Sequence, residues 1–199
     1  MTATHRNSGT FRRVRSRDLV HIALFAAVTA VLGLVPAVNL GPIPITAQTL
    51  GVMLAGSVVG ARRGFLSQLL FLALVAVGLP LLPGGRGGLS VFAGPTAGYL
   101  LSWPVAALVI GLITERVWRR YNLGWGILAN VLGGMVLIYA FGVPVSAAVL
   151  GASLGTTLAG ALIFLPGDLV KAVVAAAVAV QVRRSYPVIE PPDRAVAGR

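Results

Sequence analysis

Two oppositely charged residues stand inside a long apolar stretch near the C-terminus. They are Asp168 and Lys171, in the run Phe164-Leu-Pro-Gly-Asp-Leu-Val-Lys171. Their i, i+3 spacing puts both on one face of a helix. Pro166 suits the first helical position, so Asp168 would lie where the positive helix end favours an anion. Intramembrane charge is costly and normally faces a polar cavity, so the pair predicts a ligand site; a purely structural ion pair is the alternative.

A second polar group follows two prolines, in Pro42-Ile-Pro-Ile-Thr-Ala-Gln-Thr49. Thr46 is expected to cap the N-terminus of a helix. Capping does not explain Gln48, which adds an amide at membrane depth. Thr46 and Gln48 are therefore predicted to line the same site, with ordinary helix-entry chemistry as the alternative.

Three further polar side chains are candidates for that site. Arg86 lies in a segment with five glycines, residues 83–96, and its guanidinium could receive a carboxylate bidentately. Tyr99 could donate to a ligand or anchor the membrane interface. Asn130 could line the cavity, although an interhelical hydrogen bond explains it equally well.

Membrane-spanning helices must position these residues. Of the 199 residues, 57% are hydrophobic and 11% are charged, and the mean hydropathy is +0.90. A soluble domain would carry about 25% charged residues, and a helical span needs about 20 mostly apolar residues. The chain is thus predicted to be an all-α polytopic membrane protein with a single domain. Its six expected spans are Leu19–Val38, Thr46–Val59, Phe65–Leu82, Pro95–Ile113, Gly124–Phe141 and Pro166–Val182.

The apolar stretch Val143–Leu165 could be a seventh span, a half-inserted helix or a loop. Charge favours six spans, because these place fourteen arginines on the side of both termini and only Arg86 on the other. A seventh span would move Arg183 and Arg184 outside, against the positive-inside bias. We therefore expect a membrane domain over residues 18–184 between two flexible cytoplasmic tails, residues 1–17 and 185–199.

Several classes of function are disfavoured. The net charge of +11 would suggest nucleic acid in a soluble protein, but here the arginines serve as topological anchors at the lipid bilayer, and no nucleic-acid binding is expected. Without cysteine, and with only His5 and His21, no metal site or cofactor is expected. No P-loop pattern is present, so the chain is not expected to use ATP through a P-loop, and any active uptake must draw energy from a partner or a gradient. An intramembrane hydrolase using Lys171 is a remote alternative, because no Ser stands beside that lysine.

Four motifs taken together resemble the BioY family, over about Asp18 to Val182. They are Pro42-Ile-Pro-Ile-Thr-Ala-Gln-Thr-Leu-Gly-Val-Met-Leu-Ala-Gly56, Gly78-Leu-Pro80, Gly94-Pro-Thr-Ala-Gly-Tyr99 and Phe164-Leu-Pro-Gly-Asp-Leu-Val-Lys171. The resemblance implies a six-helix substrate-binding (S) component of an energy-coupling-factor (ECF) transporter, which binds biotin from outside a bacterial cell. It also implies partners, a transmembrane coupling protein and ABC ATPases, and a role for Asp168 and Lys171 in contacting the ligand.

The first span carries small residues at i, i+4 spacing, Ala23 with Ala27 and Ala26 with Ala30. Such faces let helices approach closely in lipid, either within the protein or against another subunit. The resemblance implies that Ala23 and Ala27 meet the coupling protein. An S component for another small vitamin would share the bundle and differ at the polar site residues.

Overall fold

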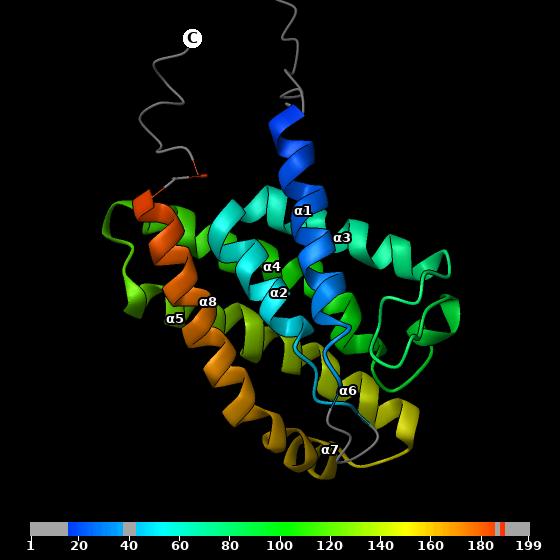
Figure 1. Ribbon diagram of the computed structural model, residues 1–199. Coiled ribbons are helices and arrows are strands. Elements are labelled where there is room, and N and C mark those ends of the chain that lie inside the picture. Colours follow the sequence, from blue (N-terminus) through cyan, green and yellow to red (C-terminus); the bar gives the residue numbers. More distant parts are fainter. Residues whose placement is uncertain (1–15, 38–42, 186–187, 190–199) are drawn as a thin grey trace, which may run out of the picture.

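The computed structural model describes residues 16–37, 43–185 and 188–189, which form helices and loops (Figure 1). Within them the predicted six-helix bundle is confirmed, with several helices interrupted by π or 3₁₀ turns. The six are α1 Ser16–Leu32; α2 Gln48–Leu54 with the π-helix η1 Ala55–Val59; α3 Ala61–Ala76; α4 Ala97–Arg116; α5 Leu123–Val131, η4 Leu132–Leu137 and α6 Ile138–Leu150; and α7 Leu154–Ala161, η5 Leu162–Phe164 and α8 Leu165–Ser185. Short 3₁₀ turns, η2 Leu89–Phe92 and η3 Trp118–Arg120, lie in the connections.

Several helix ends differ from the prediction. Helix α1 stops at Leu32, six residues before the expected end at Val38, which lies outside the described residues. Thr46 is not a helix cap, because Ala47 precedes α2 and no side chain caps that end. Helix α3 begins at Ala61 rather than Phe65. The side chain of Glu115, from α4, accepts a hydrogen bond from Ala61 N at 2.7 Å and so satisfies that helix end.

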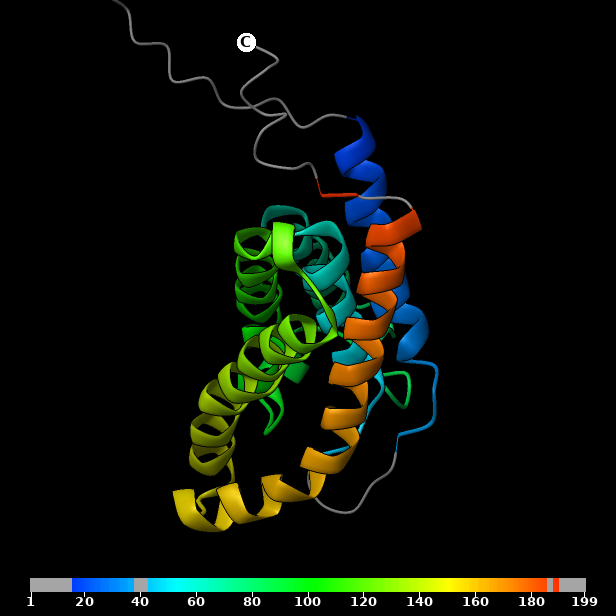
Figure 2. The ribbon, with the colours of Figure 1, turned by 90° about the vertical axis from the view of Figure 1, so that its left-hand side faces the viewer.

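The stretch Val143–Leu165 is divided between two helices. Its first part completes α6, which ends where Gly151 adopts a positive φ of 63°. Its second part forms α7, which lies across the end of the bundle opposite the start of α1 and leads through η5 into α8 (Figure 2). Both parts are apolar, so composition could not show the turn between them. The sequence left a loop or a half-helix open before the last span, and the structure has the short helix α7 there.

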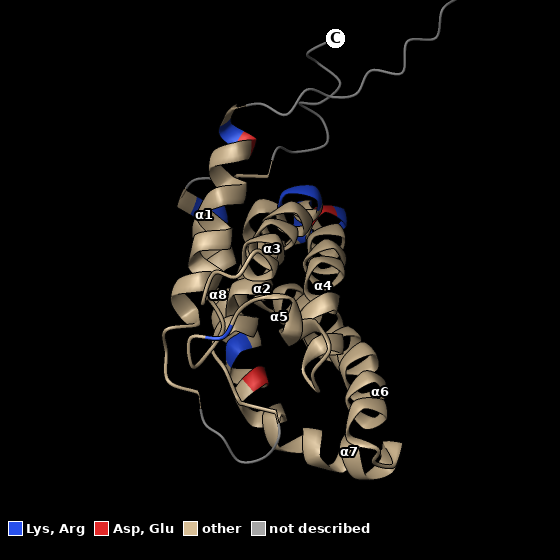
Figure 3. Cartoon of the chain, turned by 90° about the vertical axis from the view of Figure 1, so that its right-hand side faces the viewer, with Lys and Arg blue, Asp and Glu red and all other residues tan. Residues whose placement is uncertain are grey.

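The outer surface of the bundle is apolar, and charge is segregated along it. In the part of the chain that the structure describes, three helical segments are long and apolar enough to cross a membrane, by length and composition: Ala97–Arg116, Leu123–Leu150 and Leu154–Ser185. Among the described residues, arginines gather at the end where α1 begins and α8 ends (Figure 3), whereas Asp168 and Lys171 lie apart from them, in the first half of α8. The chain is a multi-pass membrane protein. The expected tails, residues 1–17 and 185–199, lie mostly outside the described residues, although Ser16 and Arg17 begin α1 and Ser185 ends α8.

Helix α4 occupies the centre of the bundle and contacts α2, α3, α5 and α6. Small residues allow this close packing. A Cβ added to Gly98 would lie 2.6 Å from Phe141 O, and one added to Gly111 would lie 2.2 Å from Ala61 N. The fold therefore holds α4, with the side chains that it presents, at a fixed position between its neighbours.

Candidate ligand-binding site

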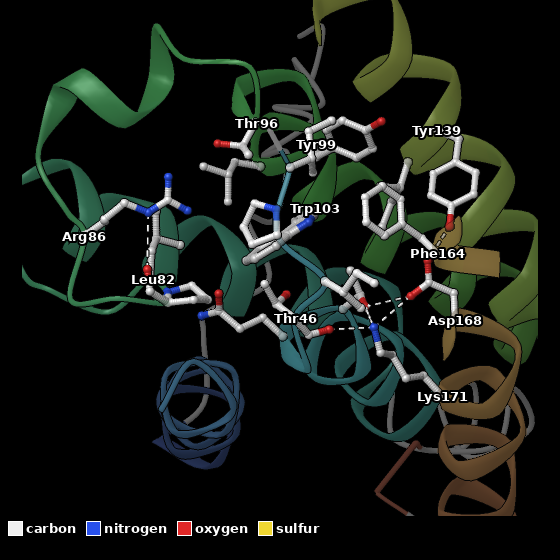
Figure 4. Close-up of a pocket in the computed structure, with 18 residues that line it drawn as sticks. Thr46, Leu82, Arg86, Thr96, Tyr99, Trp103, Tyr139, Phe164, Asp168 and Lys171 are labelled. Carbon is white, nitrogen blue, oxygen red and sulfur yellow. Dashed lines mark hydrogen bonds and ion pairs between the residues drawn. The ribbon is translucent and has the colours of Figure 1, made fainter. Parts of the chain in front are cut away.

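A cavity lies between α2, α4, α6 and α8 and extends under the Gly-rich loop after α3 (Figure 4). The space outlined by its walls is about 630 Å³, part of which is open to solvent. Its lining residues are Ile43, Pro44, Ile45, Thr46, Gln48, Thr49, Leu82, Pro83, Arg86, Thr96, Tyr99, Leu100, Trp103, Ile138, Tyr139, Phe164, Asp168 and Lys171. Six of the seven predicted binding residues are among them.

The Asp168–Lys171 pair forms one end of the cavity. Lys171 Nζ lies 2.8 Å from Asp168 Oδ1, 3.0 Å from Thr49 Oγ1 and 2.5 Å from Thr46 O. An ammonium has three N–H bonds, so these three acceptors use all of them. Lys171 therefore fastens the segment before α2 to α8 and holds the Asp168 carboxylate in place.

Asp168 retains some capacity to accept a ligand. Its side chain is 7% exposed and accepts hydrogen bonds from Lys171, from Thr49 Oγ1 at 3.3 Å and from the Tyr139 hydroxyl. A carboxylate offers roughly four lone-pair sites, so about one remains. Because η5 runs directly into α8, the start of α8 is not a free helix end. The Asp168 carboxylate is therefore stabilised by side-chain donors rather than by a helix N-terminus.

Gln48 faces the cavity in a fixed orientation. Its Nε2 donates to Thr29 O at 3.2 Å and to Leu81 O at 3.0 Å. Backbone carbonyls only accept, so the amide nitrogen must point toward them. Both N–H bonds are used, and the side-chain oxygen is the atom left to meet a ligand. Gln48 thus presents an acceptor.

Two aromatic residues of α4 bring polar atoms to the cavity wall. Tyr99 is 9% exposed and Trp103 is 4% exposed. Within the described part of the chain, neither the Tyr99 hydroxyl nor Trp103 Nε1 has a hydrogen-bond partner. The Tyr99 ring packs edge-on against the Tyr139 ring, with the centroids 6.4 Å apart. The two donors are available to a ligand.

Arg86 lies at the other end of the cavity from Asp168 (Figure 4). Its Nε donates to Pro83 O at 3.2 Å, and backbone hydrogen bonds between Leu82 and Arg86 close the turn. Gly84 and Gly85 have φ values of 76° and 70°, a conformation that favours glycine. The turn therefore positions a cation at the mouth of an otherwise mostly apolar cavity.

Trp103 and Tyr139 also line the site, although they were not among the residues predicted from the sequence. Trp103 lies one helical turn after Tyr99, so the i, i+4 spacing was a signal that could have found it. Tyr139 lies among apolar residues near the start of α6, so the sequence around it gives no signal of a site. Only the packing of α6 near α8 shows that it bonds to Asp168.

Asn130, by contrast, is not among the residues that line the cavity. It is fully buried and joins three helices: its Oδ1 accepts from Ser57 Oγ at 2.9 Å, and its Nδ2 donates to Ala172 O at 3.2 Å. The interhelical hydrogen bond that the sequence left open is therefore the observed contact.

The two alanine pairs of α1 face different ways. Ala26 is 3% exposed and Ala30 packs against the core, whereas Ala23 and Ala27 are exposed. Internal packing thus uses the first pair. The second pair leaves a small-residue surface open on the outside of the bundle.

The comparisons agree on one family. The family model for the BioY family matches residues 4–188. The biotin transporter BioY of Rhizobium etli is 49% identical over 181 residues, which cover 87% of this chain and 97% of the relative. The probable biotin transporter BioY of Bacillus subtilis is 45% identical, covering 84% of this chain and 91% of the relative.

A solved structure resembles the fold as well. It is the S component for biotin from an ECF-type ABC transporter, with a TM-score of 0.81 and 31% identity, and the match covers 84% of this chain and 91% of that one. With the family model spanning nearly the whole chain and the relatives matched over nearly their full length, the chain belongs to the BioY family.

Proposed function

We propose that this chain binds biotin in the cavity and serves as the substrate-binding subunit of an ECF-type transporter in the bacterial cell membrane. The observation that carries the proposal is the Asp168–Lys171 pair, bonded to Thr49 and Tyr139 on the wall of a mostly apolar cavity. The relatives named as biotin transporters support the choice of ligand.

The cavity suits the chemistry of biotin. The ligand has a ureido ring with two N–H donors and one carbonyl, an apolar thiophane ring and chain, and a terminal carboxylate. The remaining lone pair of Asp168 and the side-chain oxygen of Gln48 are acceptors for ureido N–H bonds. Apolar residues such as Phe164 and Ile138 line the space for the thiophane. Thr46 contributes through its carbonyl, which holds Lys171.

ATP-driven uptake would require partners, because the chain has no P-loop sequence. We assign the exposed surface of α1 around Ala23 and Ala27 as the face that meets the transmembrane coupling protein of an ATPase-driven module. The arginine-rich end of the bundle is assigned to the cytoplasmic side by the positive-inside bias. Biotin would then enter from the outer side, at the end where Arg86 lies.

Equilibrium binding of labelled biotin to the detergent-purified chain tests this function. We expect saturable binding in the sub-micromolar range that unlabelled biotin displaces and that other vitamins, such as thiamine and riboflavin, do not. Absence of saturable binding, or equal displacement by the other vitamins, would refute biotin as the ligand.

Replacing Arg86 is expected to weaken biotin selectively. In Arg86→Gln the guanidinium no longer pairs with the carboxylate, so the affinity for biotin should fall roughly tenfold, or about 1.4 kcal/mol. Biotin methyl ester lacks the carboxylate charge, so its affinity should change little. Competition binding with both ligands checks this, and an equal loss for the two would place the carboxylate elsewhere.

Replacing Asn130 should lower the stability of the fold and leave the affinity for biotin unchanged. Asn130→Ala leaves Ser57 Oγ and Ala172 O without this partner, at a cost of about 1–3 kcal/mol. We expect the apparent Tm in detergent to fall by roughly 3–10 °C, while the Kd for biotin stays within about twofold. Ser57→Ala serves as the control, and its apparent Tm should also fall. A weaker Kd at unchanged Tm would show that Asn130 acts on the ligand.

A further inference from the structure

We propose that Tyr99 and Trp103 together bind the ureido carbonyl oxygen of the ligand, through the Tyr99 hydroxyl and Trp103 Nε1. The proposal rests on the proposed function, because it takes biotin to be the occupant of the cavity. Hydrogen bonds from these two donors to the ureido oxygen would also set the orientation of the ligand in the cavity.

Among the residues that the structure describes, neither of these two buried donors has a hydrogen-bond partner. More than 90% of buried polar groups in proteins are hydrogen-bonded, and an unsatisfied one costs about 1–3 kcal/mol. Tyr99 and Trp103 are at least nine-tenths buried, lie one turn apart on α4, and both line the cavity. Each donor is therefore available to an acceptor of a ligand in the cavity.

The other donors around Asp168 are already engaged. Lys171 uses its three N–H bonds on Asp168, Thr49 and Thr46. The hydroxyls of Thr49 and Tyr139 donate to the Asp168 carboxylate, and the Gln48 amide donates to two backbone carbonyls. An acceptor at this end of the cavity therefore meets the free donors of α4.

Charge selects a neutral acceptor for this position. Tyr99 packs against Tyr139, which bonds to Asp168. A ligand carboxylate here would lie near the Asp168 carboxylate, while the cation Lys171 has no N–H left to donate to it. A ureido carbonyl carries no net charge, and its two flanking N–H bonds need acceptors such as Gln48 and Asp168. The carboxylate is then directed to Arg86, at the opposite end (Figure 4).

Tyr99→Phe and Trp103→Phe test the pair by removing one donor each while keeping an aromatic ring. The probes are labelled biotin and, by competition, 2-thiobiotin, in which sulfur replaces the ureido oxygen and accepts hydrogen bonds weakly. Each variant should bind biotin roughly tenfold more weakly and 2-thiobiotin almost as the parent does. The preference for biotin over its methyl ester should stay unchanged, since the carboxylate end is untouched.

Tyr121→Phe is the matched control, because it makes the same chemical change at a buried tyrosine that does not line the cavity. It should leave both affinities unchanged. Equal losses for biotin and 2-thiobiotin in the α4 variants would show that the aromatic residues only shape the cavity and would overturn the proposal. A changed preference against the methyl ester would instead assign the pair to the carboxylate and overturn it too. If the parent chain bound biotin in neither assay, the proposed function itself would fail.

Discussion

Asp168→Asn is expected to weaken biotin binding by at least about 100-fold. The substitution keeps the size of the side chain and removes the charge that Lys171, Thr49 and Tyr139 all face. Breaking one partner of a buried ion pair costs about 3–5 kcal/mol, and here the loss falls on the wall of the binding cavity. Equilibrium binding of labelled biotin to the purified variant measures this loss of affinity. Lys171→Ala should also weaken biotin binding.

The control for this substitution is Asp18→Asn, an identical chemical change at a second acid–base pair. Asp18 Oδ1 lies 2.7 Å from Arg63 Nε, joining α1 to α3 at the arginine-rich end of the bundle. Biotin affinity should be unchanged in this variant. If Asp168→Asn and Lys171→Ala both kept the parent affinity, the pair would be purely structural, and the site would have to be sought elsewhere.

Local patterns in the sequence predicted the six helices and the charged pair. Apolar stretches separated by glycines and arginines give the helix count, because the bilayer requires backbone groups to be bonded within each span. Asp168 and Lys171 were identified by their own i, i+3 spacing and their apolar surroundings. Neither prediction depends on which helices are neighbours in the bundle.

The remainder of the site depends on contacts between distant segments. Tyr139 bonds to Asp168 across 29 residues, and Lys171 reaches Thr46 across 125 residues. Asn130 looked equally suited to the cavity and to an interhelical bond, and only the packing of α5 against α8 and η1 decides between them. Side-chain type alone cannot supply that information.

One consequence of these contacts is that the cavity wall is built from segments that the sequence presents as separate motifs. Lys171 joins the segment before α2 to α8, and Gln48 joins α2 to α1 and to the segment before the Gly-rich loop. The polar residues therefore do two tasks at once: some hold the wall together, and the atoms left unbonded face the ligand. The hydrogen bonds made by each atom distinguish the atoms that hold the wall from those that face the ligand.

The position of α4, which carries Tyr99 and Trp103, depends on its contact with α3 at Gly111. A Cβ added there would lie 2.2 Å from Ala61 N and 2.4 Å from Ala61 Cα. These are backbone atoms, so they cannot move aside as a flexible side chain could, and the two helices must separate. We expect Gly111→Ala to cost about 3 kcal/mol and to lower the apparent Tm in detergent by roughly 6–12 °C.

Gly160→Ala in α7 is the matched control for Gly111→Ala, because nothing lies within 4 Å of a Cβ added there. Alanine is favoured over glycine in a helix by up to about 1 kcal/mol, so the Tm should stay the same or rise slightly. A similar fall in both variants would mean that the loss of glycine itself, rather than the α3–α4 contact, is responsible. A fall only in Gly111→Ala, accompanied by weaker biotin binding, would connect the close helix approach to the geometry of the cavity, because moving α4 also moves Tyr99 and Trp103.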